Sequence, residues 1–169
     1  MAMVYIGIGS NLAEPHVQVR QAINELRQLK GCELLSASSL YKSKPLVDPL
    51  NVLSDAKQPD YVNAVVAIET DREPLSLLDD LQAIEETHGR VRTAERWGPR
   101  TLDLDVLLID DKIIKHARLI IPHPGLHERS FVLYPLHEIA PDLVIPGYGP
   151  LTGLVAQCDD DGLERLDKA

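Results

Sequence analysis

The chain has 169 residues, of which 44% are apolar and 25% are charged, and its formal net charge is -9. This length and apolar content predict a single globular domain over residues 1–169 and exclude a disordered chain. No apolar run approaches the ~20 residues of a membrane span, and no basic signal-peptide region begins the chain. We therefore expect a cytoplasmic protein without a membrane partner. The negative charge also disfavours a nucleic-acid partner, because phosphate backbones bind basic faces.

Six predicted elements follow one another in the first two thirds of the chain. In order, they are a strand over residues 3–9, a helix from Pro15 to Gly31, strands over 33–41 and 61–69, a helix from Pro74 to Gly89 and a strand over 101–109. The strands are predicted from alternating apolar residues, and the helices from apolar residues three and four apart. This order is typical of the ferredoxin-like split βαβ, so we expect an α+β fold with a βαββαβ core and a mainly antiparallel sheet.

The remaining segments have weaker patterns. Residues 45–59 are predicted to form a long loop, because they contain Pro, Asp and Asn without periodicity. Asp110 and Asp111 predict a turn into a C-terminal hairpin strand at 112–114. Six prolines between residues 122 and 150 predict irregular structure with short helical turns, followed by a last helix over 151–157.

Two aspartates on the strand over 101–109 carry the most informative chemistry. Asp103 and Asp105 alternate with apolar residues, so their side chains point to one face, with Cα atoms about 6.5–7 Å apart. Adjacent carboxylates repel each other unless a cation lies between them, and Mg²⁺ is their natural partner. Such a pair alone would favour a solvated strand face. However, aspartate is disfavoured in strands, and this pair follows a segment that is rich in arginine.

Four arginines precede or adjoin the aspartate pair. Arg90, Arg92, Arg96 and Arg100 fall within eleven positions of an otherwise acidic chain, next to Gly89 and a Gly-Pro step at 98–99. Arginine suits phosphate oxygens because its guanidinium can donate two parallel hydrogen bonds. A local basic island fits a small polyanion better than a polymer. The segment therefore predicts a mobile catalytic loop beside a magnesium–nucleotide site.

Several segments, in chain order, resemble motifs of the 6-hydroxymethyl-7,8-dihydropterin pyrophosphokinase family. They are Gly7-Ile8-Gly9-Ser10-Asn11-Leu12, residues 58–64, Gly89-Arg90-Val91-Arg92, residues 96–109, and Ile121-Pro122-His123-Pro124 with Arg129-Ser130-Phe131. The resemblance extends from residue 4 to about residue 146. It implies an ATP-dependent enzyme of folate biosynthesis, which transfers pyrophosphate to the hydroxymethyl oxygen of 6-hydroxymethyl-7,8-dihydropterin and releases AMP.

The resemblance also implies a role for individual residues. The expected catalytic residues are Arg90, Arg92, Asp103 and Asp105, and the two aspartates would bind two Mg²⁺ ions that bridge the ATP phosphates. The expected ATP contacts are Gln82, Glu85, Arg92, Arg96, Trp97, Arg100, Val106, Arg118, His123 and Arg129. The expected pterin contacts are Ser43, Leu46, Tyr61, Asn63 and Phe131. Tyr61 and Phe131 would stack on the two sides of the ring, and Asn63 would read its edge.

Two other classes of function stay open on the residues alone. A two-metal phosphohydrolase or nuclease would use the aspartate pair for attack by water, and the acidic net charge opposes this reading. A non-catalytic ferredoxin-like module that binds nucleotides or RNA would show stacking aromatics on central strands and a basic face. The chain shows neither clearly. We expect a monomer that acts on two small molecules, ATP and a pterin.

Overall fold

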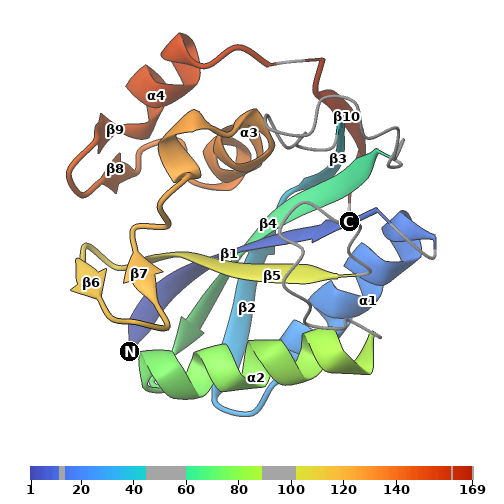
Figure 1. The fold of residues 1–169 in the computed structure, drawn as a ribbon, viewed down its shortest axis with the longest axis vertical. Coiled ribbons are helices and arrows are strands. Elements are labelled where there is room, and N and C mark those ends of the chain that lie inside the picture. The colour runs from blue at the N-terminus through green and yellow to red at the C-terminus, as the bar shows by residue number, and fades with distance from the viewer. Residues whose placement is uncertain (12–13, 45–59, 89–101, 161, 169) are drawn as a thin grey trace.

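A six-stranded sheet lies between two layers of helices (Figure 1). The computed structural model describes residues 1–11, 14–44, 60–88, 102–160 and 162–168. In chain order the elements are β1 (Ala2–Ser10), α1 (Pro15–Arg27), β2 (Cys32–Ala37), β3 (Ser39–Ser43), β4 (Tyr61–Thr70), α2 (Pro74–Thr87), β5 (Asp103–Ile109), β6 (Ile114–Lys115), β7 (Ile120–Ile121), the 3₁₀ turn η1 (Leu126–Glu128), α3 (Ser130–Ile139), β8 (Val144–Ile145), β9 (Gly149–Pro150), α4 (Leu151–Gln157) and β10 (Glu164–Lys168). The predicted α+β fold is confirmed.

The strands are ordered β10-β3-β4-β1-β5, and β2 also pairs with β4. Every pairing in this sheet is antiparallel, as predicted. β1 lies between β4 and β5, so Gly9 faces Asn63 on one neighbour and Asp103 on the other. β1 therefore brings residues that are 40 positions apart in the sequence into one row across the sheet.

The two sides of the sheet bury different apolar clusters. α1 and α2 cover one side, where Val4, Ile6 and Ile8 of β1 pack against residues such as Leu26 and Leu81. α3 and α4 cover part of the other side, where the cluster includes Val65, Leu107, Leu133, Leu136 and Leu151. Among the described residues, no helix combines the length and apolar character needed to cross a bilayer.

The strand predicted over 33–41 is wrong in one respect, because two strands occupy this stretch. They are separated at Ser38, whose N–H donates to the Val65 carbonyl at 2.9 Å. The Ser38 hydroxyl accepts the Val65 N–H, also at 2.9 Å. The Val65 N–H is thus bonded to a side-chain oxygen and not to a backbone carbonyl. On one side of this point β4 pairs with β2, and on the other side it pairs with β3. α1 also ends at Arg27, before Gly31.

The C-terminal third is more regular than predicted. α3 has ten residues and contains Pro135, although the prolines had indicated short turns only. Burial of Val132, Leu133 and Leu136 stabilises this helix despite the missing proline N–H. The hairpin strand predicted over 112–114 is displaced, because β6 begins only at Ile114, and it pairs with β7. The strand β10 was not predicted, while the helix over 151–157 is confirmed as α4.

Candidate active site

The aspartate pair lies on the side of the sheet that α3 partly covers. Asp103 and Asp105 face Gly9 and Gly7 on β1. Leu104, between them, is buried in the core beneath α1 and α2. Because side chains alternate along a strand, both aspartates point to the opposite side, as predicted. Asp105 is exposed and Asp103 is half-buried, so solvent or a ligand can reach the pair.

The carboxylates are chemically suited to Mg²⁺ that is also bound by phosphate. Gly7 and Gly9 leave the neighbouring ladder positions without side chains, which provides room beside the pair. Within the described part of the chain, no group of three or more His, Cys, Asp or Glu side chains is arranged to hold a metal. Mg²⁺ is commonly held by one or two carboxylates, with waters and substrate phosphates as its other ligands. Asp103 and Asp105 fit this type of open site.

Glu85 supports the aspartate strand from its outer edge. Its side chain is only 4% exposed. Its Oε2 accepts the backbone N–H of Leu104 at 2.8 Å. The hydrogen bond fixes the backbone between the two aspartates.

Only the backbone of Val106, and not its side chain, can contact a nucleotide. The side chain is 4% exposed and belongs to the core beneath α1 and α2. Val106 is two residues beyond Leu104 on the same strand, so its backbone faces the same outer edge of β5. The expected ATP contact at this position is therefore limited to main-chain atoms.

Three of the expected pterin residues meet on β3 and β4. The Nδ2 of Asn63 donates to the Ser43 hydroxyl at 2.7 Å and to the Tyr41 carbonyl at 3.2 Å. A Cβ atom at Gly9 would lie 3.3 Å from Asn63 Oδ1 and 3.7 Å from Tyr61 Cδ1. Tyr61 and Asn63 thus share a face, as predicted. It is the face of the aspartate pair, since Gly9 lies opposite both Asn63 and Asp103.

Phe131 approaches this face from the first turn of α3. It is half-buried and packs against the apolar cluster that contains Val65 and Leu107. Val65 follows Asn63 by two residues on β4, and Leu107 follows Asp105 by two residues on β5. The Arg129 guanidinium lies 5.9 Å from the centroid of the Phe131 ring. The expected ring-stacking residue and the expected phosphate contact therefore lie together.

His123 and Arg129 form a second pair of neighbours. Burial, followed by the nearby positive charge of Arg129, lowers the pKa of His123 from 6.5 to about 4. Its Nδ1 accepts the Gly125 N–H at 3.3 Å, so the proton of the neutral ring lies on Nε2. His123 can then meet a phosphate as a neutral hydrogen-bond donor. A Cβ at position 125 would lie 2.5 Å from Arg129 Nε, so a larger residue there would displace the Arg129 guanidinium.

Gln82 and Arg118 meet on the exposed side of α2. The Arg118 Nη2 donates to Gln82 Oε1 at 3.4 Å and forms an ion pair with Asp79 at 2.6 Å. Asp79 was not among the predicted site residues, although it precedes Gln82 by three positions and so lies on the same helix face. The remaining expected residues, Arg90, Arg92, Arg96, Trp97, Arg100 and Leu46, lie outside the described residues.

Two residues next to the expected pterin contacts, Tyr41 and Glu138, were not predicted from the sequence. Tyr41 pairs with Asn63 across β3 and β4. Its hydroxyl donates to Glu138 of α3 at 2.6 Å. The alternation of Tyr41 with Ser43 could have placed Tyr41 on the site face. No pattern in the sequence connects Tyr41 with Glu138, 97 positions away.

Comparison with known proteins gives consistent matches. A family model described as 7,8-dihydro-6-hydroxymethylpterin-pyrophosphokinase (HPPK) matches residues 5–141. A 2-amino-4-hydroxy-6-hydroxymethyldihydropteridine pyrophosphokinase of Haemophilus influenzae is 49% identical over 167 residues, which cover 99% of each chain. The protein of that name from Pseudomonas aeruginosa is 47% identical over 98% of each chain.

A solved structure of Plasmodium falciparum HPPK-DHPS has the same fold, with a TM-score of 0.68 and 15% identity. The match covers 92% of this chain but only 43% of the Plasmodium chain. The chain thus spans less than half the length of that longer protein.

Proposed function

The chain belongs to the 7,8-dihydro-6-hydroxymethylpterin-pyrophosphokinase family, and we propose that it transfers pyrophosphate from ATP to 6-hydroxymethyl-7,8-dihydropterin. The products are AMP and the dihydropterin diphosphate, an intermediate of folate biosynthesis. The main support for this function is the position of two groups of residues on one face of the sheet. Tyr61 and Asn63, suited to a flat heterocycle, share a sheet face with Asp103 and Asp105, suited to metal-bound phosphate.

The spacing of these two groups fits a transfer between two bound molecules. One strand, β1, separates Asn63 from Asp103, and the intervening residue is Gly9. Two strand spacings correspond to about 9–10 Å between backbones. A pterin held at β4 can therefore extend its hydroxymethyl group over Gly9 toward a phosphate at β5. A side chain at position 9 would stand in this path.

The pterin side of the site recognises a flat ring with an amide-like edge. The two Nδ2 protons of Asn63 are used by Ser43 and Tyr41. Its Oδ1 faces the site beside Gly9, where it can accept an N–H of the pterin. Tyr61 and Phe131 supply aromatic faces for offset stacking. Leu46 completes the proposed contacts.

The nucleotide side holds a triphosphate through carboxylates, arginines and a neutral histidine. Asp103 and Asp105 would hold two Mg²⁺ ions, which when bound neutralise phosphate charge and orient the reacting oxygens. Gln82, Arg118, His123 and Arg129 contribute polar contacts, as do Trp97 and the backbone of Val106. Glu85 is buried and acts on this side of the site through the Leu104 backbone. Arg96 and Arg100 hold the nucleotide, while Arg90 and Arg92 stabilise charge on the transferred group. Phosphoryl-type transfers need little help from a general base.

An AMP-release assay tests the proposal. The full chain is incubated with ATP and Mg²⁺, with and without 6-hydroxymethyl-7,8-dihydropterin, and AMP and the pterin diphosphate are quantified together. We expect equimolar formation of both, which requires the pterin and stops when EDTA removes the metal. Release of AMP or ADP at the same rate without the pterin would instead indicate a phosphohydrolase.

A further inference from the structure

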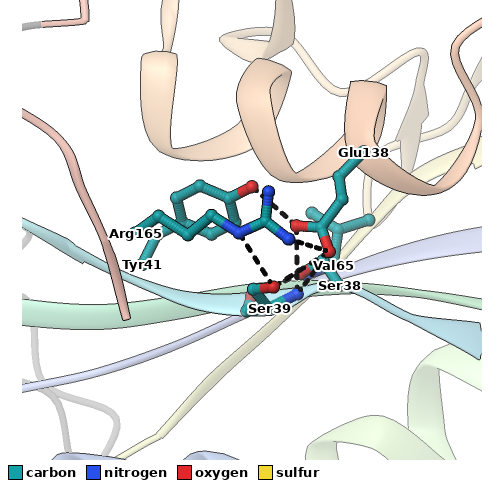
Figure 2. Close-up of polar contacts among 6 residues, drawn as sticks. All are labelled: Ser38, Ser39, Tyr41, Val65, Glu138 and Arg165. Atoms are coloured by element: carbon teal, nitrogen blue, oxygen red, sulfur yellow. Dashed lines mark hydrogen bonds and ion pairs between the residues drawn. The ribbon is translucent and has the colours of Figure 1, made fainter. Parts of the chain in front are cut away.

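A hydrogen-bond network connects α3 with β3 on the side of the sheet that carries the proposed pterin contacts. Figure 2 shows its residues between the helix and the strand. At its centre is Glu138, in the last turn of α3, whose side chain is 17% exposed. Its carboxylate accepts the Ser39 N–H at 3.0 and 3.1 Å, the Ser39 hydroxyl at 3.0 Å and the Tyr41 hydroxyl at 2.6 Å. Burial tends to raise the pKa of Glu138, but these hydrogen bonds and the Arg165 charge lower it on balance. The group therefore accepts as a carboxylate at neutral pH.

The network connects three elements that are distant in the sequence. Ser39 and Tyr41 belong to β3, Glu138 to α3 and Arg165 to β10. Arg165 donates through Nε to the Ser39 hydroxyl at 3.1 Å and through Nη2 to Glu138 at 3.4 Å. Arg165 is half-exposed, so its ion pair contributes little. The shorter hydrogen bonds from β3 to Glu138 make the main connection between strand and helix.

Two paths lead from Glu138 to the residues that would hold the pterin. In the first, Tyr41 donates its hydroxyl to Glu138, while its carbonyl accepts the Nδ2 of Asn63. In the second, Ser39 bonds to Glu138, and its carbonyl accepts the Ser38 hydroxyl, which in turn accepts the Val65 N–H. Asn63 and Val65 are neighbours on the site face of β4. Both paths therefore end on the strand segment that presents Asn63.

The same carboxylate also fixes the helix that carries Phe131. Phe131 and Glu138 are seven residues apart on α3, which corresponds to about 10 Å along the helix axis. Figure 2 shows Glu138 extending from the helix to the strand beneath it. The two walls of the proposed pocket, Phe131 on α3 and Tyr61 with Asn63 on β4, are thus joined through one partly buried carboxylate.

We propose that Glu138 is a positioning residue for pterin binding, which acts through Tyr41 and Ser39 to set the separation of the two pocket walls and the direction of the Asn63 amide. This inference rests on the proposed function, because it takes the pterin to lie between those walls. Glu138 itself does not touch the ring. Its removal leaves the Tyr41 hydroxyl and the Ser39 N–H without their acceptor and releases the helix from the strand.

The test compares Glu138→Leu with Asp80→Leu as a matched control. Asp80 is a partly buried carboxylate on α2, paired with Arg72 at 2.6 Å on the other side of the sheet. Calorimetric titration measures the dissociation constants of 6-hydroxymethyl-7,8-dihydropterin and of a non-hydrolysable MgATP analogue, and thermal unfolding measures the Tm. We expect both variants to lower the Tm. Only Glu138→Leu should also weaken pterin binding, by roughly tenfold or about 1.4 kcal/mol, because the Tyr41 hydroxyl and the Ser39 N–H lose the acceptor that positions the pocket wall.

Two further variants keep the test decisive. Tyr41→Phe removes a single hydroxyl and should weaken pterin binding by about threefold without altering nucleotide binding, even if Glu138→Leu does not fold. Glu138→Gln retains one acceptor oxygen and should restore most of the pterin affinity. The inference is overturned if Glu138→Leu and Tyr41→Phe change the Tm but leave the pterin dissociation constant at the wild-type value. A wild-type chain that binds no pterin would instead refute the proposed function itself.

Discussion

The two faces of the central sheet differ in what the same strands present. Toward α1 and α2, β1 contributes Val4, Ile6 and Ile8, which are at most 3% exposed. Toward α3, β1 contributes Gly7 and Gly9, and its neighbours contribute Asn63 and the aspartate pair. Because side chains alternate along a strand, one short sequence specifies a core on one face and a site on the other. Stability and activity should therefore respond separately to substitutions on the two faces.

The largest difference between the effect on activity and the effect on stability is expected for the two aspartates. Asp103→Asn and Asp105→Asn keep the side-chain volume but remove a negative charge from the proposed metal site. We expect each to lower AMP formation by at least about 10²–10³-fold, since metal and electrostatic stabilisation of the transition state are lost. Thermal unfolding should show little change in Tm, because both side chains lie outside the apolar cores. Asp142→Asn, at an exposed turn after α3, is the matched control.

A substitution on the core face should have the reverse effect. Ile68→Ala removes a side chain of β4 that is 0% exposed, and we expect a loss of roughly 2–5 kcal/mol in the free energy of unfolding by urea. The turnover of the folded enzyme should stay within about twofold of wild type, because the site face is unchanged. Leu35→Ala, at a position that is 44% exposed, should have little effect on either quantity. A large fall in turnover for Ile68→Ala at full folding would show that the two faces are coupled.

Much of this division between the faces could be predicted from the sequence. Alternation placed Asp103 and Asp105 on one face, and it placed Tyr61 and Asn63 together, because strand period is a local property. The starts of α1 and α2 were also predictable, since Pro15 and Pro74 occupy the first helical turn. Alternation does not predict which strands lie next to each other in the sheet. The row from Asn63 through Gly9 to Asp103 follows from the pairing of β1 with β4 and β5.

The residues that support the site were harder to predict. Glu85 is a buried carboxylate and Glu138 a partly buried one, and a charged residue is expected on the surface unless its partners are known. Their partners are backbone N–H groups of Leu104 and Ser39, 19 and 99 positions away. No local pattern reports such contacts. The same reason explains why β10, which pairs only with β3 in the described chain, was missed.

Gly9 allows a finer test of the difference between the two faces of the sheet, because it lies on the site face of a central strand. In Gly9→Ala the new Cβ would lie 3.3 Å from Asn63 Oδ1, so the amide must move by a few tenths of an ångström. We expect the KM for the pterin to rise about fivefold, with the KM for ATP unchanged. Stability should hold or increase by about 0.5–1 kcal/mol, since alanine restricts the unfolded chain more than glycine does.

Gly7→Ala is the matched control for Gly9→Ala. It lies on the same strand and the same face, but the nearest atoms to its Cβ would be those of the Leu107 side chain, at 3.4 Å. It should show the gain in stability without the change in the KM for the pterin. An equal rise of that KM in both variants would mean that the strand as a whole, and not the Asn63 contact, limits pterin binding.

The last prediction concerns acid stability on the site side. His123 has a pKa of about 4 in the folded chain, against 6.5 as its ordinary value. Between these pH values the unfolded chain binds the additional proton, so the stability that neutral His123 contributes above pH 6.5 is lost as the pH falls toward 4. In His123→Asn, which cannot titrate, the loss of unfolding free energy between pH 7 and pH 4.5 should be smaller by roughly 2 kcal/mol. Urea unfolding at both pH values measures this difference, and His16→Asn, at an exposed position of α1, should lose as much stability as the wild type. If His123→Asn loses as much as well, the histidine is solvated in the folded protein and would meet a phosphate as a cation at mildly acidic pH.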